Sequence, residues 1–118
     1  AVYRSIDRGS SWKKMSNTVS GATGPHYYQE LYASPHKFDR LYLMNVRILT
    51  SEDGGKTFVQ LQERDKHSDN HSIAFRDNDP NYLLVGTDAG TPYVINRAHF
   101  FPYLKVSIDR VNDGKLTF

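Results

Sequence analysis

Short stretches of alternating apolar and polar residues run along most of the chain, which is the pattern of β-strands with one covered face. They lie at residues 2–5, 12–15, 27–33, 58–62, 72–75 and 93–95. The runs at 41–45 and 83–86 are nearly continuously apolar, which predicts strands covered on both faces. An Asp/Asn/Pro turn is predicted at 76–82. No stretch has helical spacing with a cap and a stop, so the pattern predicts an all-β fold.

Two turns repeat the same residue types in the same register. Residues 51–58 read Ser-Glu-Asp-Gly-Gly-Lys-Thr-Phe, and residues 5–12 read Ser-Ile-Asp-Arg-Gly-Ser-Ser-Trp. In each turn the aspartate can accept hydrogen bonds from backbone N–H groups, and the glycine can take a positive φ. Trp12 can fold back over the apolar face of its hairpin. Asp7 and Asp53 are therefore expected to hold turns and not to act as catalytic acids.

The spacing of the repeated elements gives a period. The two turns are 46 residues apart (51 − 5), and the two apolar runs are 42 apart (83 − 41). Both values lie in the range of about 40–50 residues that is typical of propeller blades. The sequence predicts blades of four antiparallel strands, about two to two and a half in number. Residues 1–20 would end one blade, 26–62 would form a full blade, and 71–118 would form a further blade with an insertion.

Composition and charge exclude several classes of function. The net charge is +2 and no basic cluster is long enough to follow a phosphate backbone, so no nucleic-acid partner is expected. The absence of cysteine excludes disulfides, thiol catalysis and zinc–thiolate sites. No apolar run approaches the length of a transmembrane segment. Because a propeller needs about four to eight blades to close, the rest is expected from a longer chain or from other subunits.

The first candidate site is the alternating pattern His67, Asp69 and His71. On an extended strand the three side chains would project from one face. They could hold a divalent metal, or Asp69 could act as a catalytic acid or base. The alternative is a polar strand entrance whose side chains bond neighbouring loops, with no cofactor required. Asp88 could come near Asp69 as a second carboxyl group, the arrangement that a glycosidase needs, or could contribute to binding.

The second candidate site is an aromatic run in the predicted insertion, formed by Phe100, Phe101 and Tyr103. A run of this kind is hard to bury in an ordinary blade, so we expect it to pack against a neighbouring blade, chain or ligand. The tyrosines of residues 27–32 could also stack on sugar rings. Aromatic residues in strands more often belong to the core, and a core role is the prediction for them.

The two turns resemble the Asp box, or bacterial neuraminidase repeat, whose pattern is Ser/Thr-x-Asp-x-Gly-x-Thr-Trp/Phe. The matching residues are Ser5, Asp7, Gly9, Ser11 and Trp12 in the first turn and Ser51, Asp53, Gly55, Thr57 and Phe58 in the second. Asp boxes occur in sialidases, in xyloglucan-cleaving glycoside hydrolases, in sortilin-type receptors and in photosystem assembly factors. The resemblance implies that the boxes are structural and lie away from the active face.

Residues 67–75 and 79–90 are similar to exported bacterial proteins that are labelled glycosyl hydrolase or sortilin-like. This resemblance implies an extracellular or periplasmic segment that binds glycans or resembles a glycoside hydrolase. One alternative is a non-enzymatic, sortilin-like propeller that binds protein partners. Another is a subunit or assembly factor of a larger complex. The Phe/Tyr-Arg-Ile-Pro motif of sialidases is missing, so a sialidase proper is not expected.

Overall fold

The computed structural model describes residues 1–21, 29–61, 63, 66–90 and 92–97, which form three antiparallel β-sheets and no helix. The first sheet is the hairpin of β1 (Val2–Arg4) and β2 (Lys13–Ser16). The second contains β3 (Glu30–Ala33), β4 (Leu41–Met44), β5 (Ile48–Ser51) and β6 (Val59–Gln60). The third contains β7 (Asn70–Arg76), β8 (Asp79–Thr87) and β9 (Tyr93–Asn96). The predicted all-β class is confirmed.

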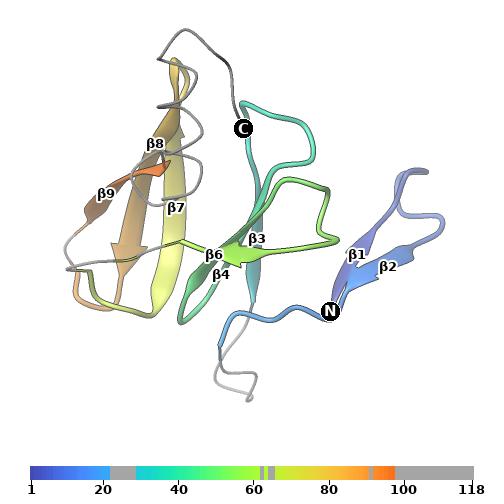
Figure 1. Ribbon diagram of the computed structural model, residues 1–118, viewed down its shortest axis with the longest axis horizontal. Helices are drawn as coiled ribbons and strands as arrows, with labels where there is room; N and C mark the ends of the chain where they lie inside the picture. Colours follow the sequence, from blue (N-terminus) through green and yellow to red (C-terminus); the bar gives the residue numbers. More distant parts are fainter. Residues whose placement is uncertain (22–28, 62, 64–65, 91, 98–118) are drawn as a thin grey trace, which may run out of the picture.

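The three sheets follow one another in space in the order of the chain (Figure 1). Within each sheet, every strand pairs with the next one along the sequence, so all connections are hairpins. The described residues thus form three open sheets. They contain no helix of the length and apolarity that a membrane crossing requires.

The second sheet has its most apolar strand in its interior. Leu43 of β4 lies opposite Leu31 of β3 on one side and Leu49 of β5 on the other. Tyr42, Leu43 and Met44 are all buried, at 1%, 3% and 0% exposure. The prediction that this run is covered on both faces is confirmed.

The third sheet is longer than the sequence pattern predicts. β7 continues to Arg76 and β8 already begins at Asp79, so the turn predicted over residues 76–82 is reduced to its first part. The register shifts between Phe75 and Arg76, where Arg76 lies opposite Asp79. Proline lacks an N–H and is tolerated in strands at such irregularities, which explains how Pro80 lies within β8.

The core lies between the second and third sheets. Its buried members are Tyr42, Met44, Ile48, Leu61, Leu83, Val85 and Ile95. Phe75 packs at its border, with its ring centroid 5.7 Å from that of Tyr42. Burying one large apolar side chain contributes about 1.5–3 kcal/mol, so this interface supplies most of the apolar stabilisation. The first hairpin adds Val2 to the buried apolar residues.

Candidate functional site

The first repeated turn joins β1 to β2 and is closed by its own side chains. Ser5 Oγ accepts a hydrogen bond from Gly9 N at 2.7 Å and donates one to Asp7 Oδ1 at 2.8 Å. The Asp7 carboxylate accepts from Ser11 N at 2.8 Å and from Ser11 Oγ at 2.6 Å. Gly9 has φ +92°, a conformation that favours glycine. These bonds fix the turn without help from any other segment.

The second repeated turn, between β5 and β6, has the same network. Ser51 Oγ accepts from Gly55 N at 2.9 Å and donates to Asp53 Oδ1 at 2.8 Å. Asp53 accepts from Thr57 N at 2.9 Å and from Thr57 Oγ1 at 2.5 Å. Gly55 has φ +97°. The two turns are therefore one motif in two copies, in geometry as well as in sequence.

The same bonds keep both aspartates ionised. The hydroxyl of Ser11, followed by its backbone N–H, lowers the pKa of Asp7 from 3.8 to about 2. Thr57 does the same for Asp53, whose pKa is also about 2. A carboxylate whose hydrogen bonds are all directed into its own turn is a structural group, and a general acid would need the opposite shift.

Trp12 closes the first turn but does not cover the hairpin. Its indole Nε1 donates to the backbone oxygen of Gly9 at 3.1 Å, and 63% of the residue is exposed. Trp12 was expected to be able to fold over the apolar face of the hairpin, but most of the residue is exposed and its indole N–H bonds the backbone of its own turn. Phe58, at the corresponding position of the second turn, has no such donor and is half-buried.

The second turn is also where the second sheet meets the first hairpin. A Cβ on Gly55 would lie 2.9 Å from Val2 Cγ1, and a Cβ on Gly54 would lie 2.6 Å from Arg4 Nη1. Gly54 N donates to the backbone oxygen of Asp39 at 2.9 Å. The two glycines allow the hairpin to approach more closely than a side chain would permit. The turn thus positions one sheet against the next.

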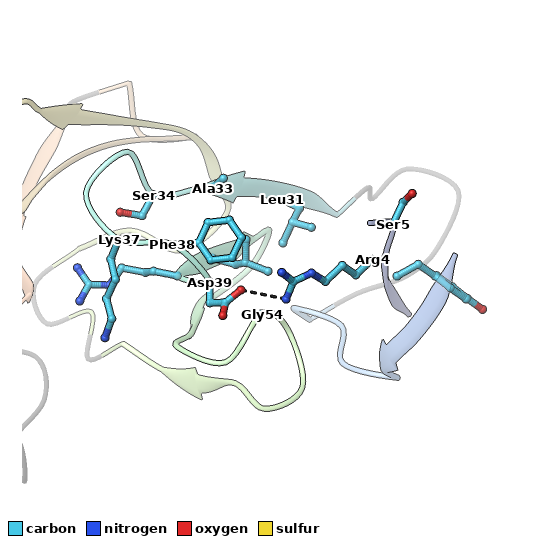
Figure 2. A pocket seen from close by; sticks show the side chains of 12 residues that line it. Arg4, Ser5, Leu31, Ala33, Ser34, Lys37, Phe38, Asp39 and Gly54 are labelled. Carbon is cyan, nitrogen blue, oxygen red and sulfur yellow. Dashed lines mark hydrogen bonds and ion pairs between the residues drawn. The ribbon is translucent and has the colours of Figure 1, made fainter. Parts of the chain in front are cut away.

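Beside this junction lies a cavity of about 400 Å³ (Figure 2). Its walls come from the end of β1, the end of β3 and the β3–β4 loop of residues 34–40. Its apolar lining is open to solvent: Tyr3 is 52% exposed, Leu31 48% and Phe38 82%. A concave site with exposed rings is the usual form of a small-ligand site.

Charged groups lie beside these rings. Arg4 Nη1 donates to Asp39 Oδ1 at 2.9 Å, as Figure 2 shows. The Arg4 guanidinium lies 5.5 Å from the centroid of the Phe38 ring, within the range of a cation–π contact. Asp39 has φ +69°, a left-handed conformation that aspartate tolerates better than most residues. The wall therefore offers donors, an acceptor and an aromatic face together.

The β3–β4 loop is tied to the second turn through Glu52. Lys37 Nζ lies 3.0 Å from Glu52 Oε2, and Arg40 Nε lies 2.9 Å from Glu52 Oε1. Arg97, which follows β9, also pairs with Glu52 Oε1. Burial alone would raise the pKa of Glu52, but these three cations outweigh burial and lower the pKa. The cluster holds the loop that carries Phe38.

The candidate residues of the first predicted site lie at or just before the start of β7, and none of them lines the cavity of Figure 2. His67, Asp69 and His71 do not share a strand face, because β7 begins only at Asn70 and Asp69 has φ +60°. His67 Nδ1 lies 2.7 Å from the backbone oxygen of Ser68. Within the part of the chain that the structure describes, no group of three or more His, Asp or Glu side chains is arranged to hold a metal ion.

Two of these candidates do meet. His71 Nε2 contacts Asp88 Oδ1, and both side chains are about half exposed. Asp88 N donates to the backbone oxygen of Asp69 at 3.2 Å, so the β8–β9 turn lies against the entrance to β7. A carboxylate that accepts a hydrogen bond from an imidazole fixes the orientation of the ring. The pair is suited to hydrogen bonding with a bound group.

Three polar residues that the sequence pattern did not single out link the second and third sheets. Lys66 Nζ donates to Glu63 Oε1 at 2.7 Å and to Asn70 Oδ1 at 2.5 Å. Asn70 Nδ2 donates to the backbone oxygen of Asn45 at 3.1 Å, and Glu63 Oε2 accepts from Ile48 N at 3.0 Å. The Lys66 side chain is only 2% exposed. The sole signal in the sequence was a Glu/Lys pair three residues apart, which is common on surfaces.

The second predicted site cannot be placed. Phe100, Phe101 and Tyr103 lie outside the described residues, as do the tyrosines at 27 and 28. Tyr32 packs against the core and donates to Glu30 Oε2 at 2.6 Å. It therefore has the core role that strand aromatics usually have.

Comparison of the chain with protein-family models, with curated proteins and with solved structures gives no match.

Proposed function

We propose that the chain is a segment of an Asp-box β-propeller that binds glycans. Two observations support the propeller: both turns have the box sequence with the same hydrogen bonds, and the second sheet is a four-stranded antiparallel meander. In this proposal the β1–β2 hairpin is the outer half of one blade, residues 26–62 are a full blade, and β7–β9 begin another. The remaining blades come from a longer chain or from other subunits.

The cavity of Figure 2 carries the glycan part of the proposal. A sugar ring has apolar C–H faces that pack on aromatic side chains, and hydroxyls that hydrogen-bond to charged groups. Phe38, which is 82% exposed, supplies a ring, and the Arg4–Asp39 pair beside it supplies donors and an acceptor. The volume lies within the range of about 300–1,000 Å³ for small-ligand sites.

The rival functions fit this cavity less well. A sortilin-like propeller would bind a peptide or a protein, and a complex subunit would bury a larger and flatter patch. An ion pair fixed beside an exposed ring suits a compact ligand with many hydroxyl groups. The proposal includes export of the protein to the periplasm or the cell exterior, and the resemblance to exported Asp-box proteins supports this part.

Replacement of Phe38 tests the proposal. Phe38→Ala should weaken binding to a panel of neutral oligosaccharides by about tenfold or more, because an exposed ring at a site is a frequent energetic anchor. The measurement is calorimetric titration with the oligosaccharide that binds best. The matched control is Val94→Ala on β9, which removes an apolar side chain that is 61% exposed on another sheet and should leave affinity unchanged.

Both variants should keep the circular dichroism and melting temperature of the parent protein, since both side chains are exposed. Equal glycan affinity of Phe38→Ala and the parent would exclude this cavity. If no oligosaccharide binds while a protein partner does, the sortilin-like alternative takes its place.

A further inference from the structure

A second groove, of about 390 Å³, runs between the two Asp boxes. Ile6 and Trp12 of the first box line it, as does Lys56 of the second, and Arg4 belongs both to this groove and to the cavity of Figure 2. Each box fixes its own backbone, and Gly54 and Gly55 of the second box lie directly against Arg4 and Val2 of β1, so the side chains that the two boxes present here have a defined relative placement. The groove is therefore a preformed surface.

The apolar part of the groove is held open to solvent. Ile6 is 89% exposed and Trp12 is 63% exposed. The indole N–H already donates to Gly9 O, so the exposed ring can offer a ligand only its faces and edges. Exposed aromatic surface that is fixed in orientation costs little conformational entropy on binding. It marks a contact for a flat, partly apolar ligand.

The charged part of the groove is basic. Its lining includes Arg4, Lys13 and Lys56, and none of the described lining residues is acidic. Arg4 is paired with Asp39, whereas Lys13 and Lys56 form no ion pair with any other described residue. By contrast, Lys37 beside the other cavity is paired with Glu52. Two ammonium groups that have no ion-pair partner among the described residues thus line the same groove as Trp12, and they favour a negatively charged ligand.

We propose that this groove binds an anionic polysaccharide, with one sugar ring stacked on Trp12 and its carboxylate or sulfate groups paired with Lys13 and Lys56. The inference rests on the proposed glycan-binding function and adds a second site and a charge class. A saccharide fits better than an acidic peptide, because a single flat ring matches a sugar face, whereas peptide recognition uses a series of side-chain pockets.

The test uses ligands that differ only in charge. Trp12 is the single tryptophan of the chain, so its fluorescence reports contact at the ring directly. An oligogalacturonate should change this fluorescence, and its methyl ester, with the same rings but no charge, should bind at least about tenfold more weakly. Added salt should weaken the binding of the acid and leave the binding of the ester unchanged. A heparin oligosaccharide then shows whether sulfate replaces carboxylate.

Substitutions locate the site. Lys13→Gln combined with Lys56→Gln should abolish the preference for the acid over the ester. Lys14→Gln is the matched control for Lys13→Gln, because Lys14 is the exposed neighbour on β2 that does not line the groove. Trp12→Ala, followed by calorimetry, should weaken binding of both ligands, whereas Trp12→Phe keeps a ring and should retain binding.

The outcomes separate this inference from the function on which it rests. Equal affinity for acid and ester would overturn the proposal that the groove binds anionic saccharides, and so would equal effects of Lys13→Gln and Lys14→Gln. In either case neutral glycans could still bind at the Phe38 cavity, and the proposed function would stand. Tighter binding of poly-glutamate than of either acidic saccharide would overturn the ligand class. Failure of every saccharide, neutral or acidic, would instead overturn the proposed function.

Discussion

Asp53 shows how a single side chain organises its turn. Its carboxylate accepts hydrogen bonds from the backbone and the hydroxyl of Thr57 and from the hydroxyl of Ser51. Hydrogen bonds to a charged group contribute about 1.5–3 kcal/mol when they are shielded from solvent and less at a partly exposed site. Asp7 repeats these bonds on the exposed hairpin. The two sites differ in that the turn of Asp53 also contacts a neighbouring sheet.

The stability of the protein should therefore depend on the ionisation of Asp53. Its pKa is lower in the folded protein, about 2, than the ordinary value of 3.8. The stabilisation is thus fully present above pH 3.8 and is lost as the pH falls toward 2. Asp53→Asn should lower the free energy of unfolding by about 1–2 kcal/mol at neutral pH, and by less in acid.

Urea unfolding at several pH values measures this difference. Asp77→Asn, in the exposed β7–β8 turn, is the control and should lower the free energy of unfolding at neutral pH by much less than Asp53→Asn does. A difference between parent and Asp53→Asn that stays constant down to pH 2 would contradict the assigned role.

The turn between β5 and β6 acts through its closeness to the hairpin. Gly55→Ala introduces a Cβ at φ +97° that would lie 2.9 Å from Val2 Cγ1. Gly90→Ala has the same backbone problem, at φ +78°, but no atom lies within 4 Å of its Cβ. The strain of a left-handed alanine costs about 1–2 kcal/mol in both variants, and overpacking adds about 1–3 kcal/mol in Gly55→Ala alone.

Thermal unfolding of the two variants measures the cost of overpacking against Val2 separately from backbone strain, because Gly90→Ala carries the strain alone and serves as the matched control. Gly55→Ala should also disturb the Figure 2 cavity, whose lining includes the adjacent Gly54. Equal losses of stability would show that the hairpin does not rest on this turn.

The arrangement of the sheets depends on a polar connection as well as on the core. Lys66, Glu63 and Asn70 join the β4–β5 turn to the start of β7. Removing one partner of a buried ion pair costs about 3–5 kcal/mol, because the other charge stays buried. Lys66→Met should therefore strongly destabilise the protein, and the double variant Lys66→Met with Glu63→Gln should recover part of the loss.

Chemical unfolding of these variants, with hydrogen exchange of β7 amides, measures the effect. Lys37→Met is the control, since Lys37 forms an exposed pair with Glu52 and should change stability by less than about 1 kcal/mol. If Lys66→Met and Lys37→Met lower the free energy of unfolding equally, the polar connection of Lys66, Glu63 and Asn70 is not a determinant of sheet packing.

Contacts between neighbours in the chain could be predicted from the order of amino acids. The hydrogen bonds within the two repeated turns span at most four residues, and strand alternation acts over similar distances, so both turns and the all-β class were predicted correctly. One local failure is instructive: the His67–His71 pattern assumed an extended backbone. Asp69 takes φ +60° where its N–H bonds Val46 O, a partner 23 residues away (69 − 46).

Contacts between distant segments depended on how the sheets pack. The Arg4–Asp39 pair joins residues 35 apart, and Arg97 reaches Glu52 across 45. The exposure of Phe38 and the burial of Lys66 likewise depend on which faces and loops of the sheets meet. A hydrophobic pattern specifies that a strand has a covered face. It does not specify what covers that face. The cavity beside Phe38 and the groove beside Trp12 both lie where β1 and its turn meet the second sheet, so only the packing of the sheets forms them.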